Sequence, residues 1–518
     1  MLFRPFAVHV GDMQRVNHGE NRRIIDLTRR AVTENAQTGV KSFACDTCLF
    51  KCFCCGCICR GLLVHRPTLG NDPAFARAAC DEANLDLIVF DTPAQCSKLG
   101  THICFAATAQ FQRKLLCDRF RHVRGPKKRY IKSMADVTQT TDGRATPKPR
   151  FIGSEIYRNS SYGAWHPLRV PRVSTVMDLS RALGWLPPAQ FVTSPRAKVA
   201  ALTGYHTPQY LAALQAAEAA QSVSANIRDR YALGTVSNPV FKEMYRRPAT
   251  SAGASLLAGE LLKHGGVIYS PASGTHHGMP DRANGFCYLN DPVLAIQSLR
   301  RNGAQKIAYI DIDAHHPDGV EHAFARDPNT LQISVHEENR WPRTGALADV
   351  GVGQVFNLPV PAGLNDDEMA LIRERIILPL VAGFRPDAIV LQCGADAVTE
   401  DPQSRLTLSN NAHWAIVAAL QPIAPRYLVL GGGGYNPWSV GRLWTGVWAT
   451  LNGFEIPDRL PPAAQSVLGA LEWEGPTRRH FPQDHWITDL KDTPRGGAIR
   501  GELRGRVDAL AARRHAWV

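Results

Sequence analysis

Two acidic residues and two histidines follow one apolar stretch in the middle of the chain. Residues 307–310 (Ile-Ala-Tyr-Ile) predict a buried strand that runs on to position 313. In extended backbone, side chains two residues apart point to the same side, so Asp311, Asp313 and His315 are expected to converge. A carboxylate and an imidazole at this spacing suit a divalent metal such as zinc. Asp311, Asp313 and His315, which His316 follows, are also compatible with a polar strand end that binds no metal.

Reactive side chains occur in three further places. A glycine-rich loop carries the pair His276-His277, Asp396 follows a second apolar stretch, and Tyr435 follows four glycines. With Asp396 a zinc site would have three protein ligands and room for water and a substrate oxygen. The histidine pair could act as general base, and a tyrosine hydroxyl could stabilise an oxyanion. Residues 431–434 lack the Lys-Ser/Thr of a phosphate-binding loop, so nucleotide binding is not expected.

Short apolar strands must position these residues. Strands are expected at 151–153, 267–269, 307–313, 331–335, 388–392 and 427–430, and most are followed by a helical pattern. Alternation of strand and helix is typical of a parallel sheet covered by helices on both faces. Sites in such folds lie beyond the carboxyl ends of the strands, where the reactive residues stand here. We therefore predict an α/β domain with its site at that edge.

Composition limits the possible partners. The 518 residues suffice for one large core or for two to three domains. Of the net charge of +13, +11 lies in residues 1–150, with 24 Lys and Arg against 13 Asp and Glu. The near-neutral remainder gives no electrostatic basis for nucleic-acid binding. No apolar run reaches the ~18 residues that span a bilayer, and we find no secretion signal, so a cytoplasmic protein without a membrane partner is expected.

Cysteines gather near the amino terminus. Eleven of the 13 precede residue 118, and seven of them lie within residues 45–59. The Cys45-x-x-Cys48 spacing permits a zinc or soft-metal cluster, but no second well-spaced pair follows. The alternative is a poorly ordered segment, or one that is not part of the natural protein, because Met134 begins a polar stretch typical of an amino terminus.

Three regions follow from these patterns. We expect a Cys-rich basic extension at 1–150, a catalytic domain at 151–455, and a C-terminal extension at 456–518 that packs on this domain. A disulfide framework is excluded for residues 151–518, because only Cys287 and Cys393 are present there.

Five motifs, in order, resemble the zinc-dependent histone deacetylase family, and most of all its bacterial acetoin-utilization deacetylase branch. They are His276-His277, Gly285-Phe-Cys-Tyr-Leu-Asn-Asp291, Asp311-Ile-Asp-Ala-His-His-Pro-Asp-Gly-Val320, Leu391-Gln-Cys-Gly-Ala-Asp396 and Leu430-Gly-Gly-Gly-Gly-Tyr435. The similarity runs from about residue 151 to the mid-450s. It implies the arginase/deacetylase fold, a single three-layer domain around an eight-stranded parallel sheet.

The resemblance also implies a role for each matching residue. Zinc would bind Asp313, His315 and Asp396. A general acid/base pair, His276 and His277, would be backed by Asp311 and Asp318, and Tyr435 would polarise the scissile carbonyl. A narrow substrate channel would be lined by Gly285, Phe286, Trp341 and Gln403. Arg172 would lie near the inner cavity, and Asp311 and Ser334 would contribute to a potassium site beside the metal strand.

Three positions depart from the family pattern. Pro317 replaces the usual glycine after the second histidine of the metal strand, and it could displace Asp318. The aspartate that holds the substrate backbone at the rim is expected within residues 206–210, where Pro208 and Gln209 stand. Gln403 is neutral where polyamine-selective relatives are acidic, so selection of a polycation is not supported.

These observations predict a zinc-dependent amidohydrolase that removes acetyl groups from acetylated lysine side chains by metal-activated water. The alternative is a deacetylase of acetylpolyamines or other small acetylated amines. A binuclear manganese ureohydrolase is less favoured, because it needs Asp-x-His-x-Asp and Pro317 follows His316. A binding protein without turnover is also less favoured, because every catalytic position is present. The oligomeric state is not predicted.

Overall fold

The computed structural model describes residues 47–54, 57–65, 86–90, 137–139, 145–474 and 479–513. The chain divides into two compact units, Met1–Arg129 and Tyr130–Val518. In the first unit β1 (Thr47–Cys54) pairs antiparallel with β2 (Cys57–His65), and β2 pairs parallel with β3 (Asp86–Phe90). The side chains of the proposed cysteine cluster lie outside what the structure describes, so that cluster stays a prediction.

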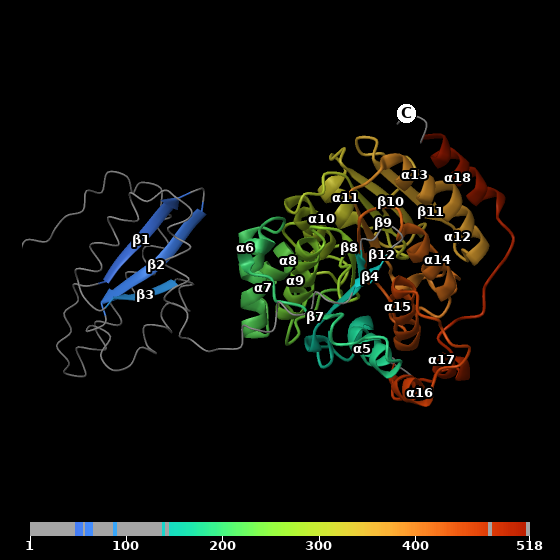
Figure 1. Ribbon diagram of the computed structural model, residues 1–518, viewed down its shortest axis with the longest axis horizontal. Helices are drawn as coiled ribbons and strands as arrows, with labels where there is room; N and C mark the ends of the chain where they lie inside the picture. Colours follow the sequence, from blue (N-terminus) through green and yellow to red (C-terminus); the bar gives the residue numbers. More distant parts are fainter. Residues whose placement is uncertain are drawn as a thin grey trace, which may run out of the picture. The chain divides into compact units, whose positions relative to one another are not determined.

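An eight-stranded sheet forms the centre of the second unit (Figure 1), in the order β11-β10-β9-β12-β13-β8-β6-β7. Every neighbouring pair in it is parallel. The strands are β6 (Arg150–Gly153), β7 (Phe191–Thr193), β8 (Gly266–Ser270), β9 (Ile307–Asp311), β10 (Thr330–Glu337), β11 (Val355–Val360), β12 (Ala388–Gln392) and β13 (Arg426–Leu430). The predicted parallel α/β fold is therefore confirmed.

Helices cover both faces of this sheet. Ala308 and Ile310 of β9 pack into one hydrophobic core, whereas Ile307 and Tyr309 pack into the core on the opposite face. The helices are α5 (Val173–Ala182), α6 (Val199–Leu202), α7 (Pro208–Ala220), α8 (Ala225–Tyr231), α9 (Arg246–Leu261), α10 (Asp291–Arg301), α11 (Asp318–Phe324), α12 (Asp366–Ile372), α13 (Leu378–Phe384), α14 (Asn410–Leu420), α15 (Pro437–Asn452), α16 (Pro462–Gly469), α17 (Asp484–Thr488) and α18 (Gly501–Arg513). Among the described residues, no helix is both long and apolar enough to cross a membrane.

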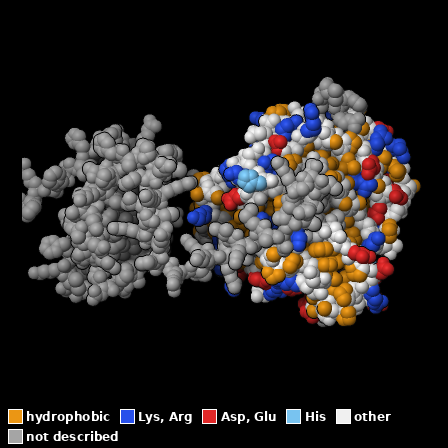
Figure 2. Space-filling model, viewed as in Figure 1, with side chains coloured by type: hydrophobic (Ala, Val, Ile, Leu, Met, Phe, Trp, Pro, Cys, Tyr) orange, Lys and Arg blue, Asp and Glu red, His pale blue; other side chains and the backbone are white. Residues whose placement is uncertain are grey.

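Shorter elements complete the unit. They are the 3-10 turns η4 (Glu155–Tyr157), η5 (Pro167–Arg169) and η7 (Ala395–Ala397), the π-helical turn η6 (Arg373–Ile377), and the two-stranded pairs β4 (Val137–Gln139) with β5 (Ala145–Pro147) and β14 (Trp473–Glu474) with β15 (Arg479–His480). On the visible face, basic and acidic side chains are intermixed (Figure 2), as the near-neutral charge of this region predicts.

Two strands of the eight-stranded sheet were not predicted from the sequence, and both lie at its edges. β7 has three residues, too few to show alternation, and β11 is interrupted by Asn357 and Pro359. Proline donates no backbone hydrogen bond, so it weakens a strand pattern but is tolerated where one side of the strand is unpaired.

Residues that follow α15 are part of the same core. Leu468 of α16, Trp486 of α17, Leu490, and Val507 of α18 are all buried in the hydrophobic cluster that also contains β9 and β12. The C-terminal segment therefore covers apolar surface that the sheet and α15 would otherwise expose to water.

Candidate active site

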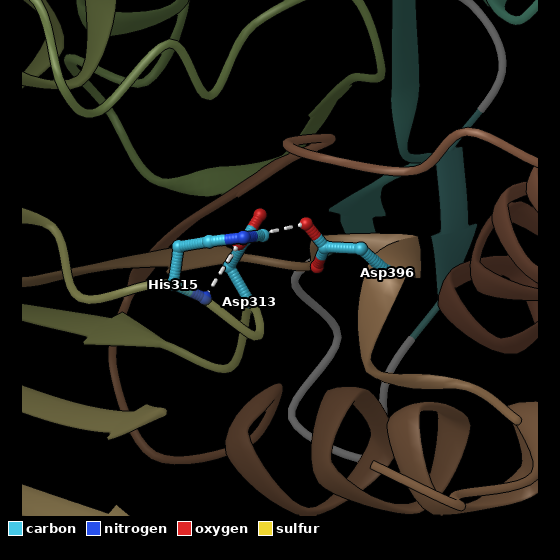
Figure 3. Close-up of side chains that lie close together, drawn as sticks. All are labelled: Asp313, His315 and Asp396. Atoms are coloured by element: carbon cyan, nitrogen blue, oxygen red, sulfur yellow. Dashed lines mark hydrogen bonds and ion pairs between the residues drawn. The ribbon is translucent and has the colours of Figure 1, made fainter. Parts of the chain in front are cut away.

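Three potential metal ligands meet where β9 and β12 end (Figure 3). One ligand atom each of Asp313, His315 and Asp396 lies within 4.8 Å of the others. His315 Nδ1 lies 3.1 Å from Asp313 Oδ1 and 3.0 Å from Asp396 Oδ2. The predicted strand at 307–313 was too long, so strand alternation does not explain the convergence in full. β9 ends at Asp311, so Asp313 and His315 lie in an irregular turn and not in extended backbone.

Backbone amides and glycines shape this cluster. Asp396 Oδ1 accepts a hydrogen bond from the Ala314 N–H at 2.9 Å, and Asp313 Oδ2 accepts one from the Gly433 N–H at 2.7 Å. A Cβ atom on Gly433 would lie 2.0 Å from Asp396 Oδ2, and one on Gly394 would lie 2.0 Å from Asp313 Oδ2. Glycine is thus required at both positions for the carboxylates to stand where they do.

The charges of the cluster fit a divalent cation. Burial and the neighbouring charge of Asp313 raise the pKa of Asp396 to about 6. Burial opposes the imidazolium of His315, but hydrogen bonds and the charges of both carboxylates outweigh it and raise its pKa to about 10. Two buried carboxylates beside one imidazole therefore favour a positive charge at this point. Carboxylate oxygen and imidazole nitrogen are both zinc ligands, so the donor set fits this metal.

His276 is oriented by a buried carboxylate. Its Nδ1 lies 2.8 Å from Asp311 Oδ2, which also accepts a hydrogen bond from the Tyr309 hydroxyl at 2.5 Å. Burial alone would lower the pKa of His276, but the charges of Asp311 and Asp313 raise it to about 9. Its ring therefore carries a proton on both nitrogens at neutral pH in the metal-free protein.

His277 has the opposite electrostatic environment. Burial and the adjacent charge of His276 lower its pKa to about 4, so its imidazole is neutral at pH 7. Its Nδ1 lies 2.7 Å from Asp318 Oδ1, and Asp318 is held in turn by the Asn284 side-chain amide at 2.9 Å. Pro317 does not displace this carboxylate, because it stands at the N-cap of α11 and leaves Asp318 in contact with the imidazole.

Tyr435 lies between the glycine loop after β13 and the start of α15. Its backbone N–H donates to Asp401 Oδ2 at 2.6 Å, and the preceding turn is held by Arg172, whose Nη1 donates to the Gly432 carbonyl at 2.7 Å. Burial and the charges of Asp396 and Asp313 hold the pKa of Tyr435 well above its usual value. The phenol therefore stays protonated and can donate a hydrogen bond.

Aromatic side chains surround the histidine pair and the tyrosine. The Trp341 ring lies 4.6 Å from that of His277, and the Phe286 ring lies 5.9 Å from that of Tyr435, both in edge-to-face geometry. Gly285 has a φ of +53°, and a Cβ there would lie 2.1 Å from the Trp341 indole. Glycine thus allows the indole to lie flush against the loop that carries Phe286.

The predicted channel residue Gln403 and the rim positions Pro208 and Gln209 have local structural roles. Gln403 is half-buried, and its backbone N–H donates to Asp401 Oδ1 at 2.9 Å. Pro208 and Gln209 form the first turn of α7, which Thr207 caps. The roles of these three side chains toward a substrate stay predictions.

Three residues that support the site were not singled out from the sequence. Asp291 accepts backbone hydrogen bonds from Gly274 and Thr275 and so holds the loop before His276. The Gln392 side chain donates to Asp313 Oδ2 at 3.0 Å, and Asp401 holds Tyr435. Asp291 and Gln392 stood inside recognised motifs, whereas Asp401 had no signal beyond an acidic residue in a polar loop.

Comparison with known proteins identifies the family. Residues 166–451 match the histone deacetylase domain family. Over 326 residues the chain is 32% identical to "Acetoin utilization protein AcuC" of Bacillus subtilis (strain 168), covering 60% of this chain and 84% of that protein. It is 35% identical over 313 residues to histone deacetylase 3 of rice (Oryza sativa subsp. japonica), covering 58% of this chain and 61% of the rice protein.

Solved structures agree. The crystal structure of a histone deacetylase homologue from Aquifex aeolicus is similar with a TM-score of 0.67 and 33% sequence identity, and it covers 70% of this chain and 100% of its own. A homologue solved in complex with SAHA gives the same values. The matched domain spans more than half of this chain, and the parallel sheet is the one that the family fold requires. The chain therefore belongs to the histone deacetylase family of metal-dependent deacetylases, and within it is similar to AcuC.

Proposed function

We propose that this protein is a zinc-dependent amidohydrolase that removes the acetyl group from acetylated lysine side chains. One observation carries the proposal. The ligand atoms of Asp313, His315 and Asp396 lie within 4.8 Å of one another, beside two imidazoles that each have a carboxylate behind them. His276 Nε2 lies 3.9 Å from Asp313 Oδ1, so the two groups adjoin.

Each residue can be given a step in hydrolysis. Zinc bound by the three ligands would polarise the acetyl carbonyl and lower the pKa of a water molecule. Neutral His277 accepts the proton of the attacking water at Nε2, because Asp318 holds its Nδ1. His276, which Asp311 holds at Nδ1, lies beside the metal ligands and can donate from Nε2 to the negative charge that develops nearby. The Tyr435 hydroxyl donates to the carbonyl oxygen, and the proton held on His277 passes to the departing amine as the C–N bond breaks.

The side chains around the site suit a substrate with an unbranched alkyl chain. Gly285, Phe286 and Trp341 bring two aromatic rings and a bare backbone around His277 and Tyr435, which suits the alkyl stem of an acetylated lysine. Gln403 adds no negative charge that would select a polyamine. A small acetylated amine is the second candidate, because Pro208 and Gln209 stand where we expect the rim aspartate that grips a peptide backbone.

Further parts of the proposal concern location and accessory ions. A potassium ion is proposed beside Asp311 and Ser334, which are register partners on β9 and β10. We place the protein in the cytoplasm, without a nucleic-acid or membrane partner. Residues 1–133 are proposed to be dispensable, so a chain that begins at Met134 should keep its full activity.

A substrate panel tests the proposal. The full chain is loaded with zinc, and acetate release is measured from an acetyl-lysine peptide and from acetylspermidine, beside a Tyr435→Phe variant. We expect the peptide to be the better substrate by kcat/KM and the variant to lose about 10²-fold or more in kcat, because it lacks the oxyanion donor. Higher kcat/KM for acetylspermidine would favour the second candidate. No acetate from either substrate, with the variant indistinguishable from the parent, would refute the enzymatic function.

A further inference from the structure

The loop between β12 and α14, residues 398–405, contacts the residue proposed to polarise the carbonyl. Asp401 accepts the backbone N–H of Tyr435 at 2.6 Å, and the Glu400 carbonyl accepts the side-chain amide of Asn436 at 3.2 Å. Asn436 is also the N-cap of α15. Two successive residues of the 398–405 loop therefore fix the backbone from which the Tyr435 side chain projects.

The same loop is held on its other side by the C-terminal segment. Both side-chain oxygens of Glu400 are paired with the Arg495 guanidinium, through Nη2 to Oε1 and through Nη1 to Oε2 at 3.3 Å. Nη1 also donates to the Leu408 carbonyl at 2.6 Å. The Glu400 side chain is only 11% exposed and that of Arg495 only 24%, so this pair is shielded from water and salt more than a surface pair would be.

Arg495 is itself held in place. Its backbone N–H donates to Asp366 Oδ2 at 2.8 Å, and Asp366 also accepts from the Ser409 hydroxyl at 2.6 Å. Three residues earlier, Asp492 forms a buried ion pair with Arg442 of α15 at 2.7 Å. The guanidinium therefore projects from a segment that is held at two points, and its bidentate pair can hold Glu400 in turn.

We propose that Arg495 is a positioning residue for Tyr435. Its ion pair with Glu400 holds the 398–405 loop in place. The hydrogen bonds of this loop, between Asp401 and Tyr435 and between Glu400 and Asn436, then fix the tyrosine backbone. The inference rests on the proposed function of Tyr435 in the deacetylase reaction. It assigns to the C-terminal segment, which lies outside the matched domain at residues 166–451, a part in the geometry of the active site.

Loss of Arg495 should loosen the loop without unfolding it. Other anchors remain, among them the Arg405 N–H to Glu337 Oε2 at 2.8 Å and the Ser404 hydroxyl to the Asp396 carbonyl at 2.5 Å. The unpaired Glu400 would turn toward water, because a nearly buried carboxylate without a partner is unfavourable. Since a displacement of about 1 Å can cost ~10²-fold in rate, partial loosening is expected to lower kcat about 10-fold.

The matched control lies in the same segment. Arg500 pairs with Glu368 of α12 through Nε to Oε1 at 2.7 Å and Nη2 to Oε2 at 2.5 Å. Its link to the 398–405 loop is indirect, because Nη1 donates to the Ala362 carbonyl and the next residue, Gly363, donates to the Arg405 carbonyl. Arg495→Ala should lower kcat about 10-fold with KM and bound zinc unchanged. Arg500→Ala should lower the melting temperature comparably while its kcat stays within about twofold of the parent. Arg495→Lys keeps the charge and should recover part of the lost kcat.

Two further measurements separate positioning from general stability. In a Tyr435→Phe background, Arg495→Ala should change kcat by less than about twofold, because the group on which it acts is already absent. The Tyr435 N–H donates a hydrogen bond to Asp401, and its hydrogen exchange should be faster in Arg495→Ala and unchanged in Arg500→Ala. Equal kcat in the two arginine variants, or an undiminished effect in the Tyr435→Phe background, would overturn the proposal. If the parent chain releases no acetate, the proposed function fails, and amide exchange still decides whether Arg495 holds Tyr435.

Discussion

Gly433→Ala is the sharpest single test of the metal cluster. The added methyl group would lie 2.0 Å from Asp396 Oδ2 and 2.9 Å from Asp313 Oδ2. Asp396 has little freedom to withdraw, because its other oxygen accepts the Ala314 N–H and its Oδ2 lies 3.0 Å from His315. The backbone of Gly433 does not lie in the left-handed region, so alanine introduces no strain of its own there.

The size of the effect follows from this geometry. Ordinary contacts of a Cβ begin at 3.4 Å, so the methyl group and the Asp396 carboxylate must separate by more than about 1 Å. A misplacement of this size costs on the order of 10²-fold in rate, or about 2.7 kcal/mol of transition-state stabilisation. Zinc affinity should fall as well, because the ligand itself has moved.

Three measurements check the prediction. Bound zinc is determined by elemental analysis after gel filtration, kcat/KM is measured with an acetyl-lysine peptide, and the fold is followed by circular dichroism. Gly383→Ala is the control. A Cβ at that position in α13 meets nothing within 4 Å, so this variant should keep zinc and activity and gain about 0.5–1 kcal/mol in stability. Gly433→Ala with full zinc and a kcat/KM within threefold of the parent would refute the assignment of the ligands.

Three further predictions concern the surroundings of the site. Asp318→Asn removes the carboxylate 2.7 Å from His277 and should lower kcat about 10²-fold at saturating peptide, with KM nearly unchanged. An unchanged kcat would exclude His277 as the general base. Trp341→Ala removes an aromatic side chain beside His277, so KM for acetyl-lysine should rise about 5- to 30-fold, because about 1–2 kcal/mol of apolar contact is lost. A constant KM would show that the substrate does not contact Trp341. Burial lowers the pKa of His206 to about 4, and its Nε2 accepts the Asn290 N–H at 2.9 Å, so unfolding takes up a proton between pH 6.5 and 4. The contribution of His206 to the free energy of unfolding should be complete above pH 6.5 and fall by about 3 kcal/mol toward pH 4, and denaturant titrations should show a shallower pH dependence in His206→Gln.

The central strands and the residues that follow them could be predicted from the sequence. A strand such as Ile307–Asp311, buried on both faces, is a continuous apolar run, and its polar successors can stand only at the carboxyl edge of a parallel sheet. The five motifs then indicated the family, which the comparisons confirmed. The edge strand Val355–Val360 was missed, because pairing on one side only leaves its sequence free to carry Asn357 and Pro359.

The sequence by itself determined which side chains could take part in chemistry, because residue types and their place after apolar strands are local properties. Their convergence depends on the tertiary structure. Asp313 and His315 meet Asp396 through a turn beyond β9, and not through the strand alternation that we had assumed. Asp401 and Arg495 gave no sequence signal, because a hydrogen bond between residues 34 positions apart, and an ion pair between residues 95 apart, depend on how the chain folds back on itself. Long-range polar contacts have no periodicity in the sequence, so only the tertiary structure decides them.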